Sequence, residues 1–197
     1  MSHKSIDAGF GGEAARPLDP LAKFATLLEF GRWADLERQA ATFIKANADR
    51  RDFDFELGMA HQYLGHALDA RGEWHQSVDA ARQGNFLLFR WGAPQTDRAI
   101  GVGCYLVAHG MSKTDEWGEA AMLAKLSLRA LEFCEEKPSR ADALFLLAEV
   151  LPHLGDDGAN RDGVREILTN LLNDKPAVAD AESFFAGVSE RLASLDS

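Results

Sequence analysis

Apolar residues recur at helical spacing along most of the chain. The steps of three and four residues place them on one face of a helix. Two such sets are Trp74, Val78, Ala81 and Leu88, and Trp117, Ala121, Ala124, Leu128 and Leu131. Runs of alternating β-branched residues with Asn-Gly or Asp-Gly turns do not occur in the sequence. The pattern therefore predicts an all-α protein.

Glycine, proline and short polar clusters interrupt this pattern and mark the expected helix ends. Pro138 and Pro176 suit the first turn of a helix, where a missing N–H costs little. The first 16 residues lack the pattern, so we expect a disordered segment over 1–16 and a single helical domain over 17–197. About nine helices are predicted, near residues 20–30, 33–47, 53–71, 74–90, 95–111, 115–135, 138–153, 161–173 and 177–194.

A short sequence motif is repeated along the chain. Trp33, Trp74 and Trp117 lie 41 and 43 residues apart, and an alanine follows each of them seven positions later. The tripeptides GRW, GEW and DEW suit a turn whose tryptophan begins the second helix of a hairpin, so we expect the three rings to be largely buried at hairpin junctions. A hairpin cannot bury both faces alone, which predicts a stacked solenoid. Helices 138–153 and 161–173 would form a fourth hairpin, and helix 177–194 a cap.

The two most regular units resemble the tetratricopeptide repeat (TPR) family. HQYLGHALDARGEWHQSVDAA, from residue 61 to 81, matches its Leu-Gly pair, its turn glycine, its aromatic residue and its later alanine. CYLVAHGMSKTDEWGEAAMLA, from 104 to 124, has Val-Ala in place of the pair. The first unit has Phe24 at the small position of the pair, and the fourth matches mainly at Leu147-Ala148.

The resemblance covers roughly residues 20 to 174 and implies a right-handed α-α superhelix, a TPR-like solenoid. The period exceeds the family's usual length of about 34 residues, so longer helices are expected. In this respect the chain is similar to the longer repeats of some bacterial peptide-sensing proteins. A carboxylate clamp of the family's common kind is not evident in the residues.

The resemblance also implies a concave groove that binds a peptide or protein segment. Such a chain would be a non-catalytic protein–protein interaction module: an adaptor, a chaperone or a regulatory receptor. The alternative is that these positions form only a hydrated helix face without a binding role. The aligned groove positions are Gln62, His66, Asp69, Tyr105, His109, Ser112, Lys113, Phe145, Glu149 and His153.

Histidines recur close to the repeat period, so metal binding and acid–base catalysis have to be considered. His66, His109 and His153 lie 43 and 44 residues apart. Neighbouring packed helices lie about 8–10 Å apart, whereas zinc needs ligand nitrogens at about 2.0–2.1 Å, so the three cannot share one ion. No nucleophile motif or phosphate-binding loop is evident, so we predict no cofactor, no metal and no catalysis. The alternative is a small-molecule or metal-dependent enzyme using the His66, His109 and Tyr105 region with Asp69.

Charge and composition narrow the partners. The chain has a net charge of −10, and residues 132–197 contain 14 acidic against 6 basic residues. This balance disfavours nucleic acid and favours a basic peptide or protein face, although the charges could serve solubility alone. No apolar run approaches the length of a membrane span and no secretory signal is evident, so we expect a cytoplasmic protein without membrane contact. Cys104 and Cys134 lie in apolar helical patterns and are predicted to be buried free thiols.

The segment 177–194 leaves the oligomeric state open. Its apolar stripe is wide enough to cover the preceding helix while Phe184 or Phe185 stays exposed at the surface. A complete cap would give a monomer. Surplus apolar surface would favour a two-fold homodimer through this end.

Overall fold

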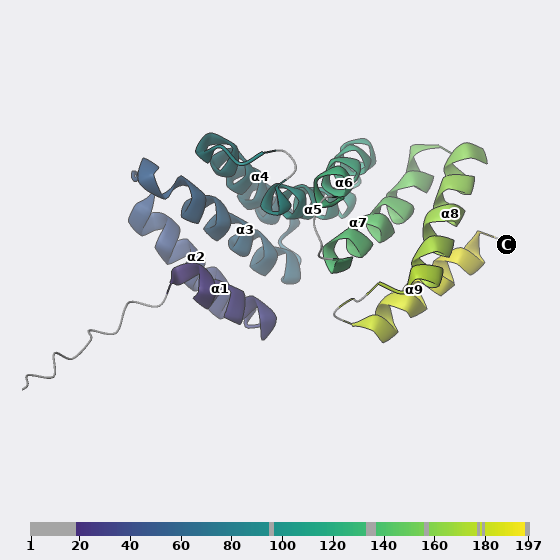
Figure 1. The fold of residues 1–197 in the computed structure, drawn as a ribbon, viewed down its shortest axis with the longest axis horizontal. Helices are drawn as coiled ribbons and strands as arrows, with labels where there is room; N and C mark the ends of the chain where they lie inside the picture. The colour runs from purple at the N-terminus through teal and green to yellow at the C-terminus, as the bar shows by residue number, and fades with distance from the viewer. Residues whose placement is uncertain are drawn as a thin grey trace, which may run out of the picture.

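The computed structural model is all-α, which confirms the predicted fold class. It describes residues 19–94, 97–132, 137–155, 158–176, 178 and 180–195, and these contain helices and no strand (Figure 1). Where the helix ends can be compared, they lie within four residues of the predicted ones; the segment 1–16 and Cys134 lie outside the described residues. The α-helices are α1 (Pro20–Glu29), α2 (Trp33–Asn47), α3 (Asp54–Ala70), α4 (Trp74–Trp91), α5 (Arg98–Ser112), α6 (Trp117–Leu131), α7 (Lys137–Val150), α8 (Gly158–Asp174) and α9 (Ala181–Ser194), with short 3-10 segments η1 (Arg51–Phe53) and η2 (Leu151–Leu154).

Consecutive helices pack against each other from α1 to α9, as expected for a stack of hairpins. The first helices of the hairpins also contact one another, α1 with α3, α3 with α5 and α5 with α7. Figure 1 shows the result as an arch, with α4 and α6 on its outer side and α3, α5 and α7 nearer its middle. None of the described helices is long and apolar enough to cross a membrane.

The three hairpin turns before the tryptophans share one backbone geometry. The residue two positions before each tryptophan is left-handed: Gly31 (φ 62°), Gly72 (φ 76°) and Asp115 (φ 63°). The next N–H then donates to the carbonyl five residues earlier, closing the end of the first helix. These bonds are Arg32 to Leu27 at 2.9 Å, Glu73 to Leu68 at 2.9 Å and Glu116 to Met111 at 3.0 Å. The repeat in the sequence is therefore a repeat in structure.

The tryptophans begin α2, α4 and α6, as predicted. Trp33, Trp74 and Trp117 are each half-buried. Trp33 packs against the core residues of α1 to α3, and Trp117 against those of α4 to α9. Trp117 also lines a surface cavity. Each tryptophan therefore lies at its hairpin junction, as predicted, with part of its surface exposed.

Small residues set the helix spacing. The alanines seven positions after the tryptophans, Ala40, Ala81 and Ala124, have no exposed surface. α3 and α4 approach most closely at a glycine pair, because a methyl group on Gly84 would lie 2.9 Å from the Gly58 carbonyl oxygen. Cys104 is buried as predicted, and burial raises the pKa of its thiol.

α9 covers the C-terminal end of the stack. Val188 is completely buried in the core cluster that α9 shares with α4 to α8. The ring of Phe184 lies 5.4 Å from that of Phe145 on α7, and Phe185 lies 5.3 Å from Phe184. Both α9 phenylalanines are half-buried.

Candidate functional site

A cavity of about 410 Å³ lies where α9 meets α7 and the turn between α5 and α6. We call it the α9 cavity. Five of the ten predicted groove residues line it. Its lining residues are Ser112, Lys113, Trp117, Phe145, Glu149, His153, Gly187, Glu190, Arg191 and Ser194.

One wall of the α9 cavity is aromatic. The imidazole of His153 stacks on the indole of Trp117, with ring centroids 3.8 Å apart and planes 8° from parallel. Trp117 is held by the turn that begins α6, and His153 by η2, where Pro152 occupies the first turn. A flat aromatic wall of this kind can pack against an apolar or planar group of a ligand.

Four charged side chains of both signs line the cavity. Among the ion pairs within the described residues, none involves Lys113, Glu149, Glu190 or Arg191. The Nε of Arg191 is buried and has no hydrogen-bond partner within the same part of the chain. Buried polar atoms without partners are uncommon in proteins. The cavity can therefore offer donors and acceptors to a ligand.

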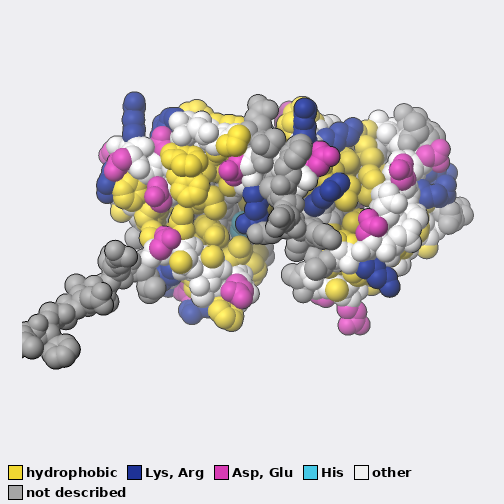
Figure 2. Space-filling model, in the orientation of Figure 1, with side chains coloured by type: hydrophobic (Ala, Val, Ile, Leu, Met, Phe, Trp, Pro, Cys, Tyr) yellow, Lys and Arg dark blue, Asp and Glu magenta, His cyan; other side chains and the backbone are white. Residues whose placement is uncertain are grey.

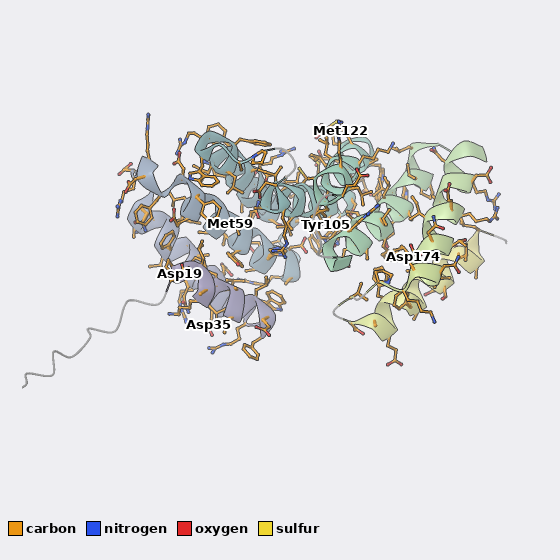
Figure 3. The ribbon with its side chains drawn as sticks, in the orientation of Figure 1. Asp19, Asp35, Met59, Tyr105, Met122 and Asp174 are labelled. Atoms are coloured by element: carbon orange, nitrogen blue, oxygen red, sulfur yellow. The ribbon has the colours of Figure 1, made fainter. Side chains whose placement is uncertain are left out.

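A second group of polar residues lies between α3, α5 and α7, below α5 in Figure 3, where Tyr105 is labelled. His109 Nδ1 lies 2.8 Å from Asp69 Oδ1, a distance at which the ring N–H donates to the carboxylate. The ring of Tyr105 stacks on that of His109 at 6.0 Å, and Trp74 meets the same imidazole edge-on at 5.7 Å. We call Asp69, Tyr105 and His109 the central cluster.

The central cluster is partly shielded from water. Burial raises the pKa of Tyr105, and the carboxylates of Asp142, Asp69 and Glu149 act in the same direction. Burial also raises the pKa of Asp142 and lowers that of His66 to about 4. Glu149 belongs to the α9 cavity, so the cluster and the cavity are adjacent parts of one polar region.

Gln62 is not part of this region, and its prediction as a groove residue is wrong. Only 3% of its surface is exposed. Its Nε2 donates to Asn85 Oδ1 at 3.0 Å and to the carbonyl of Ala99 at 2.6 Å, so it joins α3 to α4 and α5. Gly103 leaves room for this amide, because a methyl group there would meet it at 2.6 Å.

Ser112 lines the α9 cavity but is mostly buried, and its hydroxyl donates to the carbonyl of His109 at 2.7 Å. The side chains that α9 contributes, Glu190 and Arg191 above all, were not predicted. These two residues lie outside the hairpin repeats whose alignment predicted the groove positions. Their only signal in the sequence is that they fall on the polar side of the capping helix.

A larger hollow of about 700 Å³ lies between α7 and α8. It is lined in part by Leu144, Ile167 and Leu171 and contains none of the predicted groove residues.

Comparisons with known proteins leave the family unassigned, since no family model and no curated protein matches the chain. Within the described residues, no group of three or more His, Cys, Asp or Glu side chains could hold a metal ion.

Proposed function

We propose that this chain is a non-catalytic protein–protein interaction module, with TPR-like repeats, that binds a peptide or protein segment in the α9 cavity and along the central cluster. The observation that carries the proposal is the pairing of an aromatic wall with charged side chains that lack ion-pair partners among the described residues. A peptide supplies both backbone donors and acceptors and apolar side chains, which suit this lining.

The acidic C-terminal third favours a basic segment as the ligand. Residues 132–197 have a net charge of −8 by sequence. Charges of this kind speed association and fix orientation more than they add affinity. Binding should therefore weaken as salt rises, while the contact with Trp117 and His153 should respond little to salt.

The test is selection of binders from a display library of random twelve-residue peptides, followed by fluorescence anisotropy with the selected peptides. The variant Lys113→Ala/His153→Ala removes a cation and an aromatic wall from exposed positions, so its fold should be retained. Its affinity should fall about tenfold or more.

The matched control is Lys45→Ala/His75→Ala, which removes the same residue types from exposed positions on α2 and α4. Its affinity should stay within about twofold of wild type. Equal binding by the two double variants, or failure to select any peptide, would contradict the proposal.

The enzyme alternative rests on the Asp69–His109 pair, because a carboxylate that orients an imidazole is a common arrangement in acid–base catalysis. A selected peptide that is recovered chemically altered, as seen by mass spectrometry, would favour it. Recovery of the unaltered peptide favours the binding module.

A further inference from the structure

Large apolar side chains are exposed on the outer side of the arch, away from the α9 cavity. Phe86 and Phe89 on α4 are 56% and 46% exposed, and Met122 and Leu126 on α6 are 54% and 46% exposed. We call these four residues the outer patch. Single exposed apolar residues are ordinary, whereas a contiguous group indicates an interaction surface.

α4 and α6 present the outer patch in parallel, because both pack on α5 and one ion pair joins them beside the patch. Arg82 on α4 pairs with Glu119 on α6 at 3.5 Å. Both helices run antiparallel to α5, since the end of α5 meets the start of α4 at Gly110 and its start meets the end of α6 at Gly101. The two helices are therefore parallel, and the patch residues follow the ion pair on each. Phe86 and Phe89 come four and seven residues after Arg82, and Met122 and Leu126 come three and seven after Glu119.

Met122 of the outer patch lies further out on the arch than Tyr105 of the central cluster (Figure 3). In Figure 3, Met122 is labelled at the outer edge of α6, and Tyr105 lies below α5. Figure 2 shows hydrophobic side chains over α4, with Lys and Arg side chains around α6.

The charge around the outer patch differs in sign from that of the whole chain. α4 and α6 together carry four basic residues, Arg82, Arg90, Lys125 and Arg129, against two acidic ones, Asp79 and Glu119. The whole chain has a net charge of −10. The basic residues lie from the middle of each helix onward, in the same turns as the apolar side chains. Arg90 is held by Asp54 and lies 5.7 Å from the ring of Phe86.

We propose that the outer patch docks an amphipathic helix with an acidic polar face, supplied by a partner protein. α4 and α6 run parallel and each exposes two apolar side chains beyond the ion pair that joins them, so the apolar stripe of a third helix laid along them can contact both sets. Acidic residues flanking that stripe meet Lys125 and Arg129, since Arg82 and Arg90 already pair with Glu119 and Asp54. The module thus has two binding faces, an acidic one that takes a basic segment and an outer one that takes an acidic helix.

An anionic bilayer and a second copy of the chain are the competing occupants. The chain's net charge of −10 repels an anionic bilayer, and it repels a second copy that has the same charge. A local basic patch attracts an acidic helix without bringing the acidic remainder of the chain close to another extended anionic surface. The charge distribution therefore favours the helix.

The test uses fluorescein-labelled model peptides of about 18 residues, long enough to be partly helical. One has Leu and Phe on a helical stripe with Glu elsewhere, and a second has Lys in place of every Glu. Binding at the outer patch is measured for each peptide as the part lost in the variant Phe89→Ser/Leu126→Ser, so that a Lys peptide bound at the α9 cavity is not counted. This patch-dependent binding should be at least about tenfold tighter for the Glu peptide than for the Lys peptide, and it should weaken with salt. The variant Phe89→Ser/Leu126→Ser should weaken binding of the Glu peptide about tenfold or more, and Lys125→Glu/Arg129→Glu should weaken it while leaving every apolar contact in place.

The matched control is Phe30→Ser, which removes a phenylalanine that is 70% exposed at the end of α1. It should bind the Glu peptide like wild type, and all variants should keep the wild-type circular dichroism spectrum. Equal patch-dependent binding of the two peptides would overturn the proposal. So would patch-dependent binding to phosphatidylserine vesicles, or self-association that Phe89→Ser/Leu126→Ser abolishes.

Discussion

At the scale of single residues, His66 couples the charge state of the interior to folding. It lies on α3, one turn before Asp69. Burial lowers its pKa to about 4, and the nearby carboxylate of Asp69 opposes this shift without cancelling it. In the unfolded chain a histidine has a pKa near 6.5. The folded protein therefore keeps His66 neutral over a range in which the unfolded chain protonates it.

The first prediction follows from that difference. Between pH 6.5 and 4 the unfolded chain binds one proton more than the folded chain at this position, so the free energy of unfolding falls as the pH falls. The His66 contribution to this loss should be about 2 kcal/mol between pH 7 and pH 5. His66→Gln should remove it, and urea denaturation at the two pH values measures the change.

His75→Gln is the control, since His75 is exposed on α4. This variant should retain the wild-type pH dependence. If His66→Gln loses as much stability between pH 7 and pH 5 as wild type does, His66 is not the residue responsible.

Single residues also show which parts of the candidate site the sequence could not predict. Half of the predicted groove residues line the α9 cavity, and the repeat period could indicate them because it marks equivalent positions on successive hairpins. The period carries no information on local partners, however. Gln62 is interior because Asn85 and the Ala99 carbonyl accept from its amide, a contact between helices that no spacing reveals.

At the scale of helices and turns, the left-handed residue before each tryptophan is the feature most open to test. Gly72→Ala should cost about 1 kcal/mol, because alanine is disfavoured at a φ of 76°. The added methyl group would lie 3.6 Å from Trp74, an ordinary contact, so the cost comes from the backbone. Asp115→Gly should stay within about 0.5 kcal/mol of wild type, because Asp tolerates this conformation. Thermal or chemical denaturation measures both.

Asp115→Val provides the comparison at the third turn. A β-branched residue is a poor fit to left-handed backbone, so this variant should be less stable than Asp115→Gly. Equal stability of the two would show that the turn relaxes to another conformation, and the shared geometry of the three turns would then not be required.

Helices and turns were also the level at which the sequence was most informative. Helical spacing of apolar residues, with glycine and proline at the breaks, depends on local chemistry and predicts elements well. The position of α9 depends on tertiary contacts such as Phe184 with Phe145. The cap was therefore predicted as an element, whereas its contribution of Glu190 and Arg191 to the α9 cavity was not.

At the scale of the whole molecule, the core is divided along the stack. One cluster of buried residues joins α1, α2 and α3 around Leu36, and another runs from α4 to α9 and includes Val188. Both residues are fully buried. In a solenoid each unit contacts mainly its neighbours, so stability is the sum of local terms and can differ between the two ends.

This division predicts separate responses to two core truncations. Val188→Ala should cost about 2 kcal/mol and Leu36→Ala about 3 kcal/mol, as losses of buried methyl groups with cavities left behind. Amide hydrogen exchange should show reduced protection in α7, α8 and α9 for Val188→Ala, with α1 and α2 little changed, and the reverse for Leu36→Ala. A uniform loss of protection along the chain in both variants would mean that the stack unfolds as one cooperative unit. Protection lost only near Val188 would identify α9 as a cap whose opening exposes the α9 cavity while the outer patch on α4 and α6 stays folded.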